Sequence, residues 1–144
     1  MYDVVIVGAG PVGLECAIRS KRAGLNAIVL EKGVVCNSLV GYPYQMEFFS
    51  TPELLEIGDY PFTCFGYKPT REEALDYYRR VAKQCQLDIH LRTVVLGYER
   101  LIDQSLHVHT DNGAFTAKNV IIATGFFDFP NMLGVPGESL RHVA

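Results

Sequence analysis

A glycine-rich segment, GAGPVG at residues 8–13, is the first stretch of the sequence whose residue types and spacing could do chemistry. Its GxGxxG spacing is typical of dinucleotide-binding turns. Gly8 permits the tight turn, Gly10 lets the main chain approach a pyrophosphate, and Gly13 lets a helix pack closely on a strand. The N-terminus of that helix would direct free N–H groups and a positive dipole end at the phosphates. The segment therefore predicts a dinucleotide site.

An acidic residue, Glu31, follows the next apolar run, where dinucleotide-binding proteins place a carboxylate that accepts hydrogen bonds from ribose hydroxyls. A 2′-phosphate is disfavoured at that position because two negative charges would meet there. The glycine motif and Glu31 together do not distinguish FAD from NAD.

The elements that must position these residues form a βαβ unit. Residues 2–7 are a short apolar run ending in glycine, which is typical of a strand buried on both faces. Apolar residues at helical spacing predict a helix over residues 11–23, and residues 26–30 are expected to form a second buried strand. This order of elements predicts two parallel strands joined by a right-handed crossover.

The middle of the chain, residues 33–69, shows no clear period and is punctuated by glycine and proline. A loop this long inside a compact domain is usually functional. Thr70 and Glu73 match a capping box, which predicts a helix over residues 71–85. A third parallel strand is expected at residues 87–91.

The last third of the sequence predicts an antiparallel meander. Alternating residues with turn signals between them favour three strands, at residues 94–98, 106–110 and 114–117. A separate apolar strand is expected at residues 120–123. We therefore predict an α/β fold: a Rossmann-type parallel sheet with a layer of helices, and the three-stranded meander covering the other face.

Composition restricts the function further. The chain has 144 residues, which suits one domain, and 49% of them are hydrophobic and 20% charged, as in soluble globular proteins. The net charge of -3, without a basic block, argues against a nucleic-acid partner, and no apolar run is long enough to span a bilayer. The four cysteines have no CxxC spacing. We therefore expect no metal site, and a cytoplasmic protein with reduced thiols.

The segment Ala123-Thr124-Gly125, directly after an apolar run, resembles the second motif of the two-dinucleotide-binding-domain flavoproteins. That group includes the thioredoxin reductases and the flavin monooxygenases, in which these small residues let the chain pass close to the cofactor. The distance from the glycine motif makes the pair of motifs specific, and the GVPGE segment at residues 134–138 also resembles the group. The resemblance implies FAD as the cofactor.

Further segments narrow the resemblance to the bacillithiol disulfide reductase family, whose members are similar to thioredoxin reductase. These segments are EKG at 31–33, FFS at 48–50, EIGD at 56–59, YKP at 67–69 and the two aromatic residues after the ATG motif. The resemblance covers essentially the whole chain. It implies hydride transfer from NADPH to FAD, followed by electron delivery to a small-molecule acceptor such as a low-molecular-weight disulfide. It leaves a homo-oligomer open.

Two positions depart from that family. Its members usually carry a cysteine in the glycine loop, as GGGPCG, where this sequence has Val12, and Gln45 stands where they tend to have histidine. A cysteine in the loop would lie at a helix N-terminus, where the thiolate is favoured. Cys16 is expected one helical turn deeper and cannot simply replace it. Nothing in the sequence places the other cysteines, Cys36 among them, beside a flavin, so no catalytic residue is assigned.

The resemblance also suggests contacts outside the two motifs. Val95 would touch adenine through its backbone, and Lys32 would either line the adenosine pocket or be a solvated turn residue. Gln45 would either donate to flavin oxygens or lie on the loop surface. The flavin ring would lie toward residues 40–49, near Pro11.

We expect residues 1–144 to form only the FAD-binding domain of a longer enzyme. No second GxGxxG follows the first, and the C-terminal segment that closes over FAD in this family is missing from the sequence. Two other functions stay open, a non-catalytic dinucleotide-binding module and an NAD-binding dehydrogenase domain. The predicted cofactor-binding residues are Gly8, Gly10, Pro11, Val12, Gly13, Glu31, Lys32, Gln45, Val95, Ala123, Thr124 and Gly125.

Overall fold

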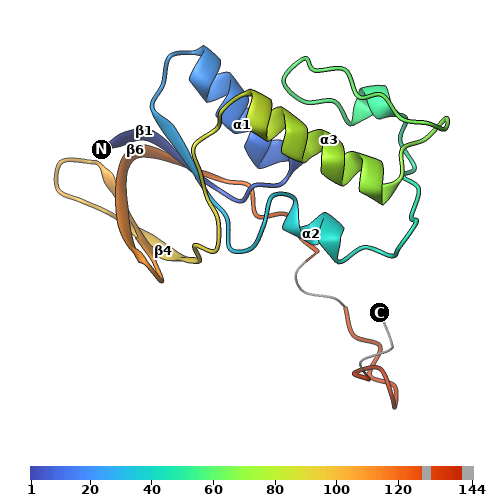
Figure 1. The fold of residues 1–144 in the computed structure, drawn as a ribbon. Coiled ribbons are helices and arrows are strands. Elements are labelled where there is room, and N and C mark those ends of the chain that lie inside the picture. Colours follow the sequence, from blue (N-terminus) through green and yellow to red (C-terminus); the bar gives the residue numbers. More distant parts are fainter. Residues whose placement is uncertain (128–130, 141–144) are drawn as a thin grey trace.

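A computed structural model of the chain describes residues 1–127 and 131–140. The strands in these residues are β1 (Tyr2–Val7), β2 (Ala27–Leu30), β3 (Ile89–His90), β4 (Val95–Arg100), β5 (Leu106–Thr110) and β6 (Gly113–Ile122). The helices are α1 (Pro11–Arg22), α2 (Asn37–Val40) and α3 (Arg71–Gln84), with a 3₁₀ turn η1 at Pro52–Leu54. The described strands form one sheet in the order β3-β2-β1-β6-β5-β4, and α1 and α3 lie side by side on one of its faces (Figure 1). The predicted α/β fold is confirmed.

The central strand β1 is buried on both faces, as its apolar run predicts. It runs parallel to β2 on one side and to β6 on the other. Because side chains alternate along a strand, Val4 and Ile6 point to the helix layer. Val5 and Val7 point to the opposite face, where they pack in a second cluster with Val108 of β5. Two apolar clusters therefore hold β1 between them.

The meander covers the second face of the parallel strands, but it is not a separate layer. β4 pairs with β5 and β5 pairs with β6, both antiparallel, and β6 continues into the parallel part. Val108 and Phe115, both on the meander, pack in the same cluster as Val5 of β1. One strongly curled sheet thus supplies both the parallel core and its cover (Figure 1).

The prediction of two strands at 114–117 and 120–123 was wrong, because both belong to the single strand β6. The polar pair Lys118-Asn119 interrupts the apolar pattern and suggested a break between them. In the structure Lys118 Nζ contacts Asp3 Oδ1 at 2.7 Å, and Asn119 Nδ2 donates to the carbonyl of Asp3 at 3.2 Å. These contacts to β1 keep the two polar residues in strand geometry at the edge of the core.

The remaining elements agree with the sequence in type and differ in extent. The capping box is confirmed: Glu73 N–H donates to Thr70 Oγ1 at 3.3 Å, and Thr70 N–H donates to Glu73 Oε2 at 2.8 Å. The third parallel strand is limited to Ile89–His90. The long segment 33–69 contains α2 and η1, which are too short to show a period in the sequence.

Candidate functional site

The three glycines of the glycine loop, residues 8–13, stand in different surroundings. Gly8 has a φ of +107°, and a Cβ there would lie 2.4 Å from the carbonyl oxygen of Ala123. A Cβ on Gly13 would lie 1.9 Å from the carbonyl oxygen of Gly8. A Cβ on Gly10 would meet nothing within 4 Å. Gly8 and Gly13 therefore serve the packing of strand, loop and helix, whereas Gly10 faces open space.

The open space in front of Gly10 lies at the N-terminus of α1. Gly10 is the N-cap residue, in extended conformation, and no side chain caps the helix. Pro11 occupies the first turn, where its missing N–H costs nothing, and that turn carries no acidic residue. The first N–H groups of a helix have no partner within it, so this end carries partial positive charge. The local structure suits an anion.

Glu31 links the end of β2 to the glycine loop. Its Oε2 accepts from the N–H of Ala9 at 2.8 Å, its Oε1 accepts from the N–H of Gly33 at 2.8 Å, and the residue is only 6% exposed. A carboxylate has about four acceptor positions, so about two are left for a ligand. This structural role of Glu31 was not predicted, because nothing in the spacing of the sequence shows which backbone groups a carboxylate will reach.

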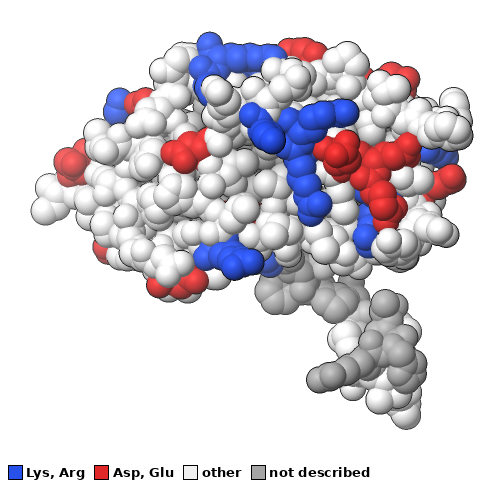
Figure 2. Space-filling model, in the orientation of Figure 1, with Lys and Arg blue, Asp and Glu red and all other residues white. Residues whose placement is uncertain are grey.

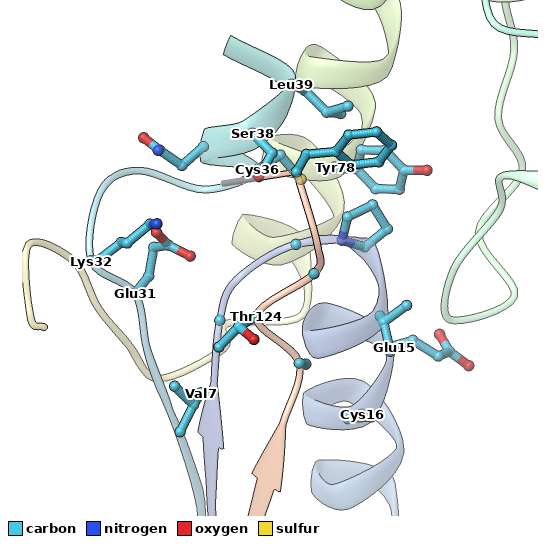
Figure 3. Close-up of a pocket in the computed structure, with 18 of the residues that line it drawn as sticks. Val7, Glu15, Cys16, Glu31, Lys32, Cys36, Ser38, Leu39, Tyr78 and Thr124 are labelled. Carbon is cyan, nitrogen blue, oxygen red and sulfur yellow. The ribbon is translucent and has the colours of Figure 1, made fainter. Parts of the chain in front are cut away.

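A cleft of about 750 Å³ joins these features. Figure 3 shows Glu31 and Lys32 on one side of the glycine loop, and Glu15 and Cys16 of α1 on the other. The lining includes every predicted cofactor-binding residue except Gly13, which packs against Gly8, and Gln45. Val95, at the start of β4, and the ATG segment at 123–125 both line the cleft, although they lie far from the glycine loop in sequence.

Gln45 lies outside the cleft. It is exposed on the loop after α2. Its φ is +59°, a backbone conformation that residues other than glycine rarely adopt. Its predicted flavin contact stays a prediction.

One wall of the cleft, the 54–58 segment, is held from behind by α3. The hydroxyl of Tyr78 donates to the carbonyl of Leu55 at 2.9 Å, and the N–H of Ile57 donates to the hydroxyl of Tyr77 at 2.9 Å. On the α1 side, Glu15 accepts from the N–H of Gly58. Tyr78 and residues 54–57 line the cleft themselves. Sequence reasoning missed this wall, and the capping box at the start of α3 was the only signal near it.

Cys36 also lines the cleft, a placement that no feature of the sequence indicated. It is the N-cap residue of α2, with a φ of +56°, and its N–H donates to the carbonyl of Ala9 at 3.0 Å. The residue is 1% exposed, and burial raises the pKa of its thiol to about 12. At neutral pH Cys36 is therefore a neutral thiol. Cys16 lines the cleft as well, one turn along α1 from Val12, which is 68% exposed.

The rest of the described chain was compared with the requirements of metal, membrane and nucleic-acid sites. Among residues 1–127 and 131–140, no group of histidine, cysteine or acidic residues could hold a metal, and no helix is long and apolar enough to cross a bilayer. All four cysteines are free. Acidic and basic side chains gather beside each other over α3 in Figure 2, as in the Asp76–Arg80 pair at 3.9 Å. That face therefore carries no continuous basic patch for nucleic acid.

Comparison with known proteins identifies the family of this chain, and its fold and cleft are consistent with that family. The chain belongs to the pyridine nucleotide-disulphide oxidoreductase family, whose sequence model matches residues 5–144. It is 42% identical over 139 residues to bacilliredoxin reductase Bdr of Bacillus subtilis, covering 96% of this chain and 43% of that protein. It is 31% identical over 144 residues to thioredoxin reductase of Treponema pallidum, covering 96% and 39%.

A solved structure agrees with these sequence matches. Bacillithiol disulfide reductase Bdr (YpdA) from Staphylococcus aureus superposes with a TM-score of 0.90 at 36% identity, covering 97% of this chain and 43% of that one. The family resemblance predicted from the motifs is confirmed. The chain spans about two-fifths of the length of these relatives.

Proposed function

We propose that residues 1–144 are the FAD-binding domain of an NAD(P)H-linked oxidoreductase of thioredoxin-reductase-like type. One arrangement carries the proposal: an uncapped helix N-terminus, open space at Gly10, and the fixed carboxylate of Glu31 meet at one point of the cleft. Pyrophosphate needs the first two and ribose the third. The cleft volume of about 750 Å³ lies within the range of cofactor sites.

The predicted residues other than Gly8 and Gly13, which serve the packing of the loop, have a place around the ligand in this proposal. The acceptor positions of Glu31 that the backbone leaves open would take ribose hydroxyls, with Lys32 and the backbone of Val95 around the adenosine. The pyrophosphate would lie over Gly10, with Pro11 and Val12 beside it. The ATG segment at 123–125 would pass close to the cofactor. A flavin contact from Gln45 requires its side chain to turn toward the cleft.

A bound flavin accepts a hydride from a nicotinamide and passes the electrons on, whereas the protein binds and orients it. We propose NADPH as the donor, bound away from Glu31, and a small-molecule acceptor of the low-molecular-weight disulfide class. The names of the relatives, bacilliredoxin reductase and bacillithiol disulfide reductase, support that class. The described glycine loop carries Val12 instead of a thiol, so direct attack on a disulfide from this loop is not part of the proposal.

We also propose a cellular compartment and an assembly for the protein. The four free cysteines favour a reducing compartment, and we propose the cytoplasm. The thioredoxin-reductase-like resemblance makes a homo-oligomer our proposed assembly.

The proposal is tested by titrating the purified full chain with FAD, NAD⁺ and ADP in a calorimeter, followed by absorption spectra after gel filtration. We expect one FAD per chain with the flavin absorption bands retained, and weaker binding of NAD⁺. Tight binding of NAD⁺ without FAD would instead support the dehydrogenase domain. Binding of FAD without turnover of NADPH in the full-length enzyme would support the non-catalytic module.

A further inference from the structure

A corner of the chain at Gly58 and Asp59 is held by three charged side chains of α1. These are Glu15, Arg19 and Arg22, whose spacing of four and three residues places them on one face of the helix. Glu15 accepts from the N–H of Gly58, and Arg22 donates to the carbonyl of the same residue. Both arginines also contact the carboxylate of Asp59, Arg19 through its Nη2 at 3.2 Å. We call these five residues the α1 clasp.

The backbone of this corner takes a conformation that needs partners to hold it. Gly58 has a φ of +61° and Asp59 a φ of +57°, so two consecutive residues are left-handed. A Cβ on Gly58 would lie 2.7 Å from Cδ1 of Ile18, so the corner packs directly on α1. The pKa of Asp59 lies below its ordinary value, because Arg22 donates to its carboxylate and Arg19 adds positive charge nearby. Asp59 is therefore ionised at neutral pH, and its ion pairs are present there.

The α1 clasp continues directly into the 54–58 wall of the cleft. Residues 54–57 line the cleft, and so does Glu15, which therefore belongs both to the lining and to the clasp. The other support of this wall comes from α3, where the hydroxyl of Tyr77 binds Ile57 and donates to the carbonyl of Tyr60 at 2.7 Å. The wall thus has one anchor on each of the two helices.

The two anchors differ in their exposure to water. Tyr77 is buried and its hydrogen bonds join uncharged groups, so salt has little effect on them. In the clasp, the side chain of Asp59 is 67% and that of Arg19 57% exposed. Exposed ion pairs are screened by salt, because the Debye length falls from about 10 Å at 0.1 M to about 3 Å at 1 M. The α3 anchor is therefore constant, whereas the α1 anchor weakens as ionic strength rises.

We infer that Glu15 and Asp59 are positioning residues, which hold the 54–58 wall in place beside the ligand space and so retain the cofactor. This inference rests on the proposed FAD site and adds a salt-sensitive control of cofactor release to it. When the ion pairs of the α1 clasp are screened, Tyr77 alone holds the wall, and the cofactor leaves faster. The larger effect belongs to Glu15, since it is the one clasp residue that also lines the cleft.

The first test needs no ligand and follows hydrogen exchange of single amides by NMR on the full chain. The Gly58 amide, which the clasp holds, is compared with the Ile57 amide, which Tyr77 holds. Relative to Ile57, exchange at Gly58 should be about two- to fivefold faster in about 1 M than in about 0.05 M sodium chloride. An exchange ratio that does not change with salt in the wild type overturns the inference.

Two variants and a matched control sharpen this test. Glu15→Gln keeps an oxygen for the Gly58 N–H but loses the charge, so exchange should be fast at both salt concentrations. Asp59→Asn should behave likewise, since asparagine tolerates the left-handed backbone. The control is Asp76→Asn, at an exposed acid on α3 that pairs with Arg80, and it should keep the salt response of the wild type. A salt response that survives unchanged in Glu15→Gln contradicts the role given to that residue.

The second test measures retention, as the rate at which the FAD-loaded full chain releases flavin fluorescence after mixing with excess ADP. At low salt, Glu15→Gln should release FAD about two- to fivefold faster than the wild type, and at high salt the two rates should converge. Convergence separates the clasp from a general loss of packing, which would leave the variant faster at both salt concentrations. A rate ratio independent of salt would therefore overturn the inference. A wild type that binds no FAD would overturn the proposed function and the retention role together, whereas the exchange at Gly58 would still report the clasp.

Discussion

The two ends of the cleft are built from different kinds of interaction. At the glycine-loop end, main chain packs on main chain: Gly13 lies against the carbonyl of Gly8, and Gly8 lies against that of Ala123. At the aromatic end, which Tyr42 and Phe127 line, and along the 54–58 wall, side chains of α3 hold loops that come from elsewhere in the sequence. Tyr78 binds the carbonyl of Leu55, and Arg71 binds that of Tyr42. One end depends on the absence of side chains, and the other depends on their presence.

This difference indicates how the work is divided along the cleft. A backbone-built end fixes the geometry that a pyrophosphate requires and allows little variation. A side-chain-built end can change its residues without changing the strands beneath it, so it can set what lies over the second half of the ligand.

The largest effect is expected from Gly10→Val. The new side chain would enter open space, so the fold should survive, but it would occupy the position where a pyrophosphate approaches the backbone. We expect binding of FAD and ADP to fall at least about 100-fold, on the order of losing two charge-assisted hydrogen bonds. Calorimetry measures the binding, and circular dichroism checks the fold. Retained FAD would show that the glycine turn is only structural.

Gly13→Ala is the matched change at the buried glycine of the same loop. Its Cβ would lie 1.9 Å from the carbonyl oxygen of Gly8, so the backbone must move. This variant should lose about 1–3 kcal/mol or more of unfolding free energy, measured by urea denaturation without ligand. Gly10→Val should lose much less. Equal losses of unfolding free energy in the two variants would contradict the distinction between Gly13, which packs inside the loop, and Gly10, which faces the ligand space.

The next effect is expected from Glu31→Ala, which should weaken dinucleotide binding by about 1.5–3 kcal/mol, the usual cost of losing a hydrogen bond to a charged group. The N–H groups of Ala9 and Gly33 would also lose their acceptor. The ribose contact of Glu31 must therefore be separated from its role in holding the loop. Deoxy analogues do this, because wild type should bind ADP more tightly than its 2′- and 3′-deoxy forms, whereas Glu31→Ala should bind them equally. Glu99→Ala, at an exposed acid on β4, serves as the control. Equal FAD and ADP affinities in wild type and mutant would remove the ribose role.

A smaller effect is expected along the 54–58 wall from Tyr78→Phe. The variant loses the hydroxyl that donates to Leu55, which should lower the unfolding free energy by about 1 kcal/mol. Tyr98→Phe, at an exposed tyrosine of β4, is the control. Burial raises the pKa of Tyr78 above its ordinary value of 10.0. The folded state then disfavours the ionised form, so wild type should lose stability above pH 10 and Tyr78→Phe should lose less. Parallel pH profiles for the two proteins would contradict this.

These two ends also differ in how far the sequence predicts them. The glycine-loop end follows from local spacing, because strand, turn and helix are adjacent in the chain and the glycines themselves carry the geometry. The aromatic end and the 54–58 wall depend on hydrogen bonds from α3 to carbonyls some twenty to thirty residues earlier, those of Arg71 to Tyr42 and of Tyr78 to Leu55. A carbonyl acceptor has no sequence signature. The contacts of Lys118 and Asn119 with the carboxylate and the carbonyl of Asp3, near the other end of the sequence, have no local signature either.

The smallest effect is expected from the thiols. Val12 stands where the family resemblance predicts a cysteine at the N-terminus of α1, and Cys16 lies one turn further along the helix. Cys36 reaches the cleft but stays a neutral, buried thiol, because burial raises its pKa to about 12. Replacing all four cysteines by serine in the full-length enzyme should therefore leave electron transfer from NADPH to a small artificial acceptor largely intact. Direct reduction of a low-molecular-weight disulfide should be slow in both proteins.

Stopped-flow kinetics with a quinone or ferricyanide, and with a small disulfide, would measure both activities. The informative gain-of-function variant is Val12→Cys, because a thiol there would meet the positive end of α1, where the thiolate is favoured. It should accelerate disulfide turnover without changing the rate with the artificial acceptor. The contrary result is disulfide turnover in the wild type that disappears only in Cys16→Ser. Cys16 would then be the thiol that attacks the disulfide, and the acceptor would have to reach one turn further along α1 than Val12.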